Sequence, residues 1–226
     1  MSRIAIIAAL PGELKPLVAA NGSAWHRSGP NLWTGTLAGH EAIAIAGGIG
    51  TQAAERAVGA ALSQGRPDAL VSYGWAGAIT CAVKPPDAFA ISEVIDHSTG
   101  EHFPTRLPGG IRLVTLDHVA VANEKRPLAE KHRAVLVDME AAAVARLAAE
   151  RGIAFYCFKG ISDGYTDRLP NMNAFIVEGR LRMPSFVAHA ALRPVYWPSL
   201  VRLGKNSTEA ATNLAQSLSK SLPATL

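Results

Sequence analysis

Three acidic residues, Glu13, Glu140 and Asp163, stand where apolar segments of the chain give way to a turn or a helix. Carboxyl groups at such junctions can act as general acids or bases when they reach the rim of a sheet. Asp163 suits the role of an acid, because Ser162 beside it can donate a hydrogen bond to the carboxylate. Glu13 could serve as a base. The sequence thus holds the parts of a carboxylate-based site.

Each acidic residue also has a structural explanation. Glu13 could be the exposed first turn of a helix, and Asp163 could cap a following helix. Glu140 lies in the segment Val137-Asp-Met-Glu-Ala141, where negative charge near a helix N-terminus is favoured whatever the function. Taken singly, none of the three decides between catalysis and structure.

A glycine-rich segment, Gly48-Ile-Gly-Thr-Gln-Ala53, satisfies the G-x-G-x-x-A pattern of dinucleotide-binding turns. It follows about the third strand rather than the first, and Asp68 precedes the next strand instead of ending it, so an acceptor for a ribose hydroxyl is missing. A tight turn with close packing of helix on strand also requires glycines. We favour that explanation and expect no bound cofactor.

The elements that must position these residues follow from hydrophobic periodicity. Apolar or alternating runs predict strands at 3–10, 33–37, 41–46, 69–73, 87–95, 112–116, 135–137 and 154–161. Helical spacing predicts helices at 13–20, 51–64, 138–152 and 208–222, and the segment 99–110 is predicted to be a loop. Alternating strands and amphipathic helices indicate an α/β fold: a three-layer α/β/α sandwich with a mixed, mostly parallel central sheet. In such sheets ligands bind beyond the carboxyl ends of the strands.

Composition is that of a globular protein, with 49% hydrophobic and 18% charged residues in 226. We expect one domain over residues 1–226, with a C-terminal extension from about residue 171. No signal peptide or spanning segment is recognised, so the expected location is cytoplasmic. Cys81 and Cys157 are expected to be small core residues, although a disulfide stays open, and no metal-ligating cluster is seen. The histidines are expected in loops or on the surface: His97, His102, His118 and His132.

The net charge of +4 is mild, and scattered basic residues argue against nucleic-acid binding. The last third nevertheless collects several of them: Arg180, Arg182, Arg193, Arg202, Lys205 and Lys220. Apolar residues lie among them: Trp197, Leu200, Val201 and Leu203. A solvated face with a packed underside explains this pattern, and a patch that contacts a membrane surface is the alternative.

Taken together and in order, the motifs resemble the superfamily of purine nucleoside phosphorylases and methylthioadenosine/S-adenosylhomocysteine nucleosidases. The resemblance runs from about residue 3 to about residue 170, and the Asp-Met-Glu-Ala and Ile-Ser-Asp pair is its most specific part. It implies that Glu13 activates the attacking water, Glu140 binds the ribose hydroxyls, and Met139 packs on the ribose face. It further implies that Asp163 donates a proton to N7 of the purine.

The same resemblance implies the remaining lining of the site. Ile49 and Gly50 would lie along the sugar and its 5′ side, and Trp75, Ala76 and Gly77 under the base and sugar. Val119 would lie beside the base, and Ser162 beside the catalytic aspartate. The chemistry fits, because cleaving an N-glycosidic bond builds positive charge on the ribose and negative charge on the departing purine.

The sequence departs from the phosphorylase branch of this superfamily. Its Gly-Asp-Pro-x-Arg phosphate turn is replaced by Leu10-Pro-Gly-Glu-Leu14, Ser72 stands in place of an arginine, and Trp75 in place of a serine or threonine. An indole offers only an N–H donor. Hydrolysis is therefore favoured, while phosphate as a co-substrate stays open through Lys15, Arg56 or Arg106.

The tail resembles the hopanoid-associated phosphorylase subfamily. The matching segments are 162–167, Leu169-Pro170, 174–179, Arg193-Pro194 and 200–203. This implies removal of adenine from adenosylhopane, a lipid-linked nucleoside, with a peripheral membrane contact left open; Trp75, Phe186, Tyr196 and Trp197 could line an apolar opening. The alternatives are a methylthioadenosine-type nucleosidase and an inactive nucleoside- or lipid-binding protein. A homo-oligomer, with a dimer as the guess, is expected from the superfamily.

Overall fold

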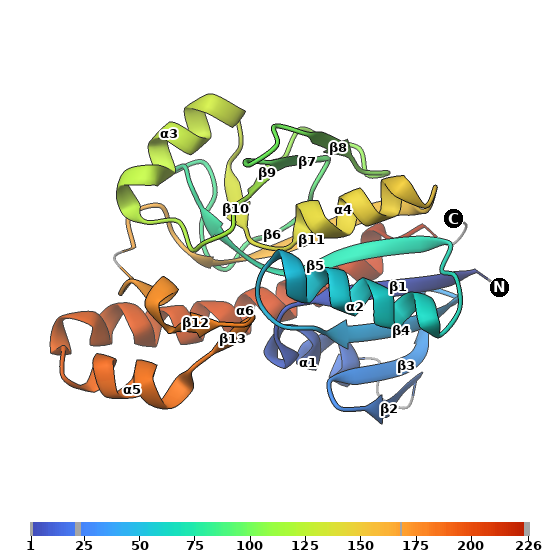
Figure 1. Ribbon diagram of the computed structural model, residues 1–226, viewed down its shortest axis with the longest axis horizontal. Helices are drawn as coiled ribbons and strands as arrows, with labels where there is room; N and C mark the ends of the chain where they lie inside the picture. Colours follow the sequence, from blue (N-terminus) through green and yellow to red (C-terminus); the bar gives the residue numbers. More distant parts are fainter. Residues whose placement is uncertain (1, 21–23, 168, 224–226) are drawn as a thin grey trace.

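The computed structural model describes residues 2–20, 24–167 and 169–223. It is built on one large sheet whose strands lie in the order β2-β3-β4-β1-β5-β10-β9-β7-β8, with β11 also pairing with β5 and β6 pairing with β11 (Figure 1). The strands are β1 (Arg3–Ala8), β2 (Trp25–Gly29), β3 (Leu32–Leu37), β4 (His40–Ala46), β5 (Ala69–Ala78), β6 (Ala88–Ala90), β7 (Glu93–Asp96), β8 (His102–Pro104), β9 (Arg112–Thr115), β10 (Leu136–Asp138) and β11 (Ala154–Asp163). A separate hairpin pairs β12 (Ile176–Val177) with β13 (Arg180–Leu181).

Helices cover both faces of this sheet. They are α1 (Pro11–Ala20), α2 (Thr51–Ser63), α3 (Ala122–His132), α4 (Ala141–Glu150), α5 (Met183–Ala191) and α6 (Trp197–Ser221). The pair α2 and α4 packs together on one face, and the pair α1 and α6 packs together on the other (Figure 1). Strands β4, β1, β5 and β11 run parallel, whereas β2, β3, β6, β8 and β10 bring in antiparallel pairs. The predicted three-layer α/β/α sandwich with a mixed, mostly parallel sheet is confirmed.

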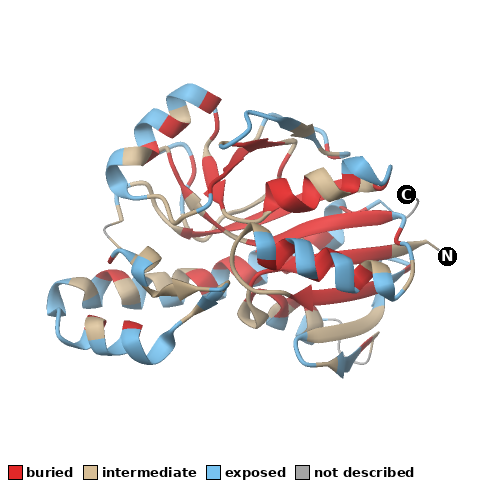
Figure 2. Cartoon of the chain, viewed as in Figure 1, coloured by how far each residue is buried: buried red, intermediate tan, exposed pale blue. Residues whose placement is uncertain are grey.

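The helix layers on the two faces of the sheet explain why the central strands are continuous apolar runs in the sequence. In β1, Ala5 and Ile7 belong to the core under α2 and α4, while Ile4 and Ile6 belong to the core on the opposite face. Strand side chains alternate between faces, so a strand covered on both sides must be apolar at every position. Burial accordingly concentrates in the sheet and the helix faces that touch it (Figure 2).

Several predicted boundaries were wrong. Strand β5 does not end at Tyr73 but continues through Gly74 to Ala78, because β11 pairs with it as far as Gly77 and β10 joins at Gly77 and Ala78. The strand predicted at 87–95 is divided into β6 and β7, and the loop predicted at 99–110 contains β8. Helix α4 begins only at Ala141, and α6 begins at Trp197 rather than at residue 208.

Helix α3 and strand β2 were not predicted. The α3 sequence is polar, contains Pro127, and buries few residues, so its periodicity carries little signal. The expectation for the cysteines was half wrong, since Cys157 is buried but Cys81 is exposed, and both are free thiols. Among the histidines, His132 is buried instead of lying on the surface.

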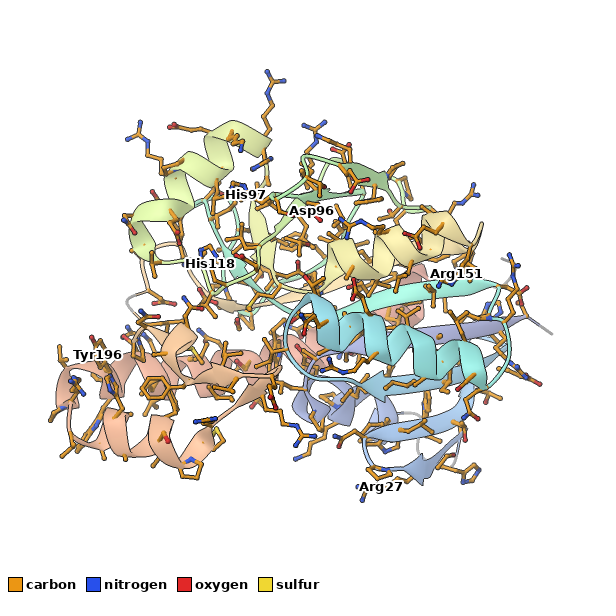
Figure 3. The ribbon with its side chains drawn as sticks, in the orientation of Figure 1. Arg27, Asp96, His97, His118, Arg151 and Tyr196 are labelled. Atoms are coloured by element: carbon orange, nitrogen blue, oxygen red, sulfur yellow. The ribbon has the colours of Figure 1, made fainter. Side chains whose placement is uncertain are left out.

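Helix α5 and the first turns of α6 form a hairpin that projects from the body of the sandwich, at the lower left of Figure 1. Tyr196 lies at the outer end of this hairpin (Figure 3). Only the second half of α6 is embedded against the sheet, through Ala210, Ala211, Leu214 and Leu218. Among the described residues, no helix is both long enough and apolar enough to span a membrane.

Candidate active site

A pocket of about 160 Å³ opens at the ends of β1, β5, β10 and β11. It brings together Glu13, Glu140 and Asp163, which are far apart in the chain. The other residues anticipated from the sequence also line it: Ile49, Trp75, Ala76, Gly77, Val119, Met139 and Ser162. Gly50, also anticipated, does not line the pocket, but its backbone N–H donates a hydrogen bond to Glu140, which does. We call this cavity the carboxylate pocket.

Glu13 is held at the start of α1 by three backbone amides. Oε2 accepts hydrogen bonds from the N–H groups of Ala9 and Leu10, both at 2.8 Å, and Oε1 accepts one from Trp75 at 2.8 Å. The side chain is 3% exposed, and this burial raises the pKa of Glu13 although the amides favour the charged form. Three converging donors make it a rigidly placed carboxylate.

Gly74 explains how the carboxylate fits beside β5. Its φ of 154° and the space above it both require glycine, because a Cβ at this position would come within 2.6 Å of Oε1 of Glu13. Gly74, just beyond the strand predicted at 69–73, therefore lies inside β5, where it makes room for the Glu13 carboxylate.

Glu140 lies just before α4. Its Oε1 accepts a hydrogen bond from the backbone N–H of Gly50 at 2.7 Å, which is the contact that ties the glycine-rich turn to the pocket. Burial, and then the nearby carboxylate of Asp138, raise the pKa of Glu140 to about 8. A carboxylate that burial makes costly to ionise is one that a nearby positive charge would stabilise.

A buried ion pair supports this part of the pocket. Lys159 Nζ on β11 lies 2.8 Å from Asp138 Oδ2, and neither side chain is more than 2% exposed. Asp138 also accepts a hydrogen bond from the Thr115 hydroxyl at 2.6 Å and one from the Ala141 N–H at 2.9 Å. Burial alone would lower the pKa of Lys159, but Asp138 raises it, so the ammonium persists. The pair fixes the β10–α4 junction from which Glu140 projects.

Asp163 ends β11 and has a cationic partner that the sequence did not reveal. Lys125 Nζ on α3 lies 3.1 Å from Asp163 Oδ2 and donates to the Gly164 carbonyl at 2.8 Å. The Ser162 hydroxyl donates to Oδ1 at 3.0 Å, as anticipated. A Cβ on Gly77 would approach both carboxylate oxygens to 3.1 Å, so glycine at this position suits the close contact.

Trp75 stands at the border of the pocket. Its indole N–H donates to the carbonyl of Ser207 on α6 at 2.9 Å, and this bond occupies its one polar hydrogen. Its ring lies against Gly12, where a Cβ would come within 3.1 Å of the indole. The same ring also lines an adjacent groove of about 570 Å³. The residues that line this groove are mainly apolar, and they include Leu181, Phe186 and Leu203.

The glycine-rich turn carries a contact that its motif did not predict. The N–H of Ile49 donates to the Gly179 carbonyl at 2.7 Å, and a Cβ on Gly48 would come within 2.8 Å of that oxygen. Gly48 thus serves the close approach of two backbones. Gly179, between β12 and β13, therefore packs on the turn. The packing of helix on strand falls to Gly47, where a Cβ would come within 2.6 Å of the Ala57 Cβ on α2. The Asn173 side chain accepts a hydrogen bond from the Val119 N–H at 2.7 Å.

Two further observations concern charge around the pocket. His118, expected in a loop or on the surface, lies in the loop before α3 and lines the pocket (Figure 3); its hydrogen bond with Asp117 raises its pKa. The cations considered for phosphate lie elsewhere: of Lys15, Arg56 and Arg106, none lines the carboxylate pocket. The described residues contain no cluster of three or more potential metal ligands.

The chain is similar in sequence to proteins of one superfamily. The sequence model of a family described as the phosphorylase superfamily matches residues 3–122 and 110–180. A 5′-methylthioadenosine/S-adenosylhomocysteine nucleosidase from Shewanella sp. (strain MR-7) is 34% identical over 97 residues, which are 42% of this chain and 41% of that protein. The match therefore spans less than half the length of this curated relative.

Solved structures extend the similarity to the whole fold. A Helicobacter pylori nucleosidase mutant with 5′-methylthioadenosine in its active site superposes with a TM-score of 0.73 at 14% identity, covering 98% of each chain. The futalosine hydrolase of the same organism gives a TM-score of 0.71 at 15% identity, covering 96% of this chain and 95% of that one. At these identities the likeness concerns the fold.

Proposed function

This chain belongs to the phosphorylase superfamily, and on that premise we propose that it is an enzyme that cleaves the N-glycosidic bond of a purine ribosyl compound, with adenine as the base. The observation that carries the proposal is the convergence of Glu13, Glu140 and Asp163 on one small pocket. The similar Shewanella protein is a nucleosidase by its description, which supports the same chemistry.

Asp163 is the proposed acid. Protonated Asp163 gives its proton to N7 of the departing purine, and the resulting carboxylate forms next to the ammonium of Lys125, 3.1 Å away. The ammonium offsets the negative charge that Asp163 gains when its proton leaves. Ser162 donates a further hydrogen bond to the same carboxylate. Lys125 is thus proposed to position Asp163 and to stabilise its charge after transfer.

Glu140 is proposed to bind the ribose. Its carboxylate accepts hydrogen bonds from the ribose hydroxyls, and Met139 packs on the ribose face. As the glycosidic bond breaks, the ribose becomes cationic, and a preorganised carboxylate lowers the energy of that state. The raised pKa of Glu140 fits this role, because its unfavourable charge is relieved when a positive charge appears beside it.

Glu13 is the proposed base for the attacking water. Its oxygens retain lone pairs that can accept from a water molecule after accepting the three backbone amides. Hydrolysis is supported over phosphorolysis, because the Trp75 N–H already donates to Ser207 and Lys125, which lines the pocket, is paired with Asp163. No cofactor or metal is assigned a role in this scheme.

For the substrate we propose an adenosine derivative with a large apolar 5′ substituent, adenosylhopane in hopanoid biosynthesis. The supporting observation is the apolar groove of about 570 Å³ that shares Trp75 with the carboxylate pocket. Phe186 lines this groove as anticipated, whereas Tyr196 lines a different cavity near α3 and Trp197 lines neither. A methylthioadenosine-type nucleosidase remains the second candidate, supported by the Shewanella relative. We further propose a cytoplasmic homodimer.

The test is release of free adenine from purified protein. Adenosylhopane, methylthioadenosine and S-adenosylhomocysteine are each incubated with the parent and with Asp163→Asn, with and without phosphate. We expect phosphate-independent release by the parent, fastest from adenosylhopane, and a loss in Asp163→Asn. Rapid release from methylthioadenosine with none from adenosylhopane would remove the lipid substrate, and no release from any of them would remove the nucleosidase assignment.

A further inference from the structure

The projecting hairpin of α5 and the start of α6 carries an unusual concentration of exposed apolar side chains. Six large hydrophobic residues between positions 183 and 201 are 52% to 81% exposed: Met183, Val187, Leu192, Val195, Trp197 and Val201. We call these six the hairpin cluster. Val121 is the other exposed large hydrophobic side chain in the described part of the chain, at 37%. Exposed apolar surface concentrated on one hairpin usually marks an interaction site.

The same segment is strongly basic. Residues 179–208 contain no Asp or Glu, so their five basic side chains give a charge of +5, more than the +4 of the whole chain. These side chains are all exposed: Arg180, Arg182, Arg193, Arg202 and Lys205. Their ion pairs are loose, with Arg202 at 3.8 Å from Asp167 and Lys205 at 3.9 Å from Glu209. Positive charge and exposed apolar side chains therefore occur together in this one segment, and much of its ribbon is coloured exposed in Figure 2.

We propose that this hairpin docks on the surface of an anionic lipid bilayer. Apolar side chains would enter the boundary between headgroups and acyl chains while Arg and Lys side chains pair with anionic headgroups, as in amphipathic helices that lie on membranes without crossing them. Trp197 suits that boundary because its ring is half-exposed and its N–H is already bonded to the Ala190 carbonyl. The hairpin attaches the protein peripherally.

A second copy of this chain fits the surface less well. The cores of protein–protein interfaces are depleted of charged side chains. A symmetric dimer through this hairpin would bring two segments of +5 face to face, which repel each other. An anionic bilayer instead complements both the charge and the apolar side chains.

The docking surface continues toward the site. Met183 belongs to the hairpin cluster and also lines the apolar groove, which shares Trp75 with the carboxylate pocket. A substrate whose 5′ group sits in the bilayer would thus meet the groove at the membrane. This last step rests on the proposed function, whereas the docking itself does not.

Flotation with lipid vesicles tests the docking. The full chain is mixed with vesicles of phosphatidylcholine alone or with added phosphatidylglycerol, at low and high salt. We expect the parent to float with the anionic vesicles and to dissociate in high salt. The variant Arg180→Ser/Arg182→Ser loses two basic groups and should bind roughly 30-fold more weakly.

A matched pair of variants isolates the apolar contribution. Leu192→Asp/Val201→Asp places two charges in the hairpin cluster, and Ala60→Asp/Ala149→Asp places the same charges at exposed positions of α2 and α4. We expect the first pair to abolish vesicle binding and the second to bind at least tenfold better than the first. All variants should keep the melting temperature and the adenine release from dissolved methylthioadenosine.

Three results would overturn the proposal. They are failure of the parent to bind anionic vesicles, equal binding by the Leu192→Asp/Val201→Asp variant, and a dimer in sedimentation analysis that this variant dissociates, which would assign the surface to a second copy. Vesicle binding by a parent protein that releases no adenine would leave docking intact and remove the proposed function, so the two failures are distinguishable.

Discussion

Replacing Glu140 by Gln should make the protein more stable and less active. In the folded protein the pKa of Glu140 is raised to about 8 from an ordinary 4.5. A carboxyl group whose pKa is raised on folding leaves stability unaffected below pH 4.5. Above that value it removes stability as pH rises toward 8, because only the unfolded chain releases the proton freely.

The size of the effect follows from the interval between the two pKa values. Between the two pKa values the ionised Glu140 lowers the free energy of unfolding by about 1.4 kcal/mol for each pH unit above 4.5. At pH 7 this loss reaches about 3 kcal/mol. Glutamine does not suffer this loss of stability, because its amide is neutral in the folded and unfolded states and its oxygen can still accept the hydrogen bond from the Gly50 N–H. We expect Glu140→Gln to be about 2–3 kcal/mol more stable at pH 7 and equal to the parent near pH 4.5.

Urea denaturation of parent and variant across this pH range measures the difference directly. Adenine release from the same samples should fall by about 10²–10³-fold, the usual loss when one preorganised electrostatic group is removed. The parent's kcat/KM should rise with pH up to about 8, whereas the variant should lack this rise. A variant that is no more stable than the parent at pH 7, or one that retains full activity, would refute the role given to this charge.

Other residues of the site give further predictions. Lys125→Met should lower adenine release by about 10²-fold, since Asp163 loses its stabilising cation; parent-like kcat would contradict this role. Glu13→Gln should cost about 1.5–3 kcal/mol in urea denaturation near pH 4.5, where the raised pKa of Glu13 contributes little to stability, because one amide donor must face another; unchanged stability at that pH would refute the three-amide cradle. Gly74→Ala should lower the free energy of unfolding by about 1–3 kcal/mol, because the added Cβ would crowd Glu13; unchanged stability would show that β5 can shift to make room. Leu203→Trp should raise KM for adenosylhopane at least tenfold, by filling the groove, while leaving KM for methylthioadenosine unchanged; equal effects on both substrates would contradict the groove's role.

The central layers of the fold could be predicted because both faces of the sheet are covered. Short apolar runs such as 3–10 and 154–161 are typical of strands covered on both faces, and the helices between them show clear periodicity. Since parallel strands end at one edge of the sheet, acidic residues after those runs were expected to meet there. Glu13 lies in the first turn of α1, just beyond the carboxyl end of β1, and Asp163 is the last residue of β11.

What escaped prediction depended on tertiary contacts. Lys125 belongs to a polar helix 38 positions from Asp163, and nothing in its local sequence marks it as buried. The sequence predicts that a strand ends just before Gly74. In the structure β5 continues past Gly74, because β11 pairs with it as far as Gly77 and β10 pairs with Gly77 and Ala78. The early start of α6 at Trp197 was missed although Trp197, Leu200 and Val201 recur at helical spacing, because Pro198 and Gly204 in the same stretch are poor helix formers and mask that spacing.

The most direct test is a structure of the protein with a non-cleavable adenosine analogue bound. We expect N7 of the base at hydrogen-bonding distance, about 3 Å, from Asp163, and the ribose hydroxyls at the same distance from Glu140. Glu13 should face C1′ of the ribose through a water molecule. An analogue bound outside the carboxylate pocket, or one whose base points away from Asp163, would contradict the assignment of the three carboxylates to one glycosidic bond.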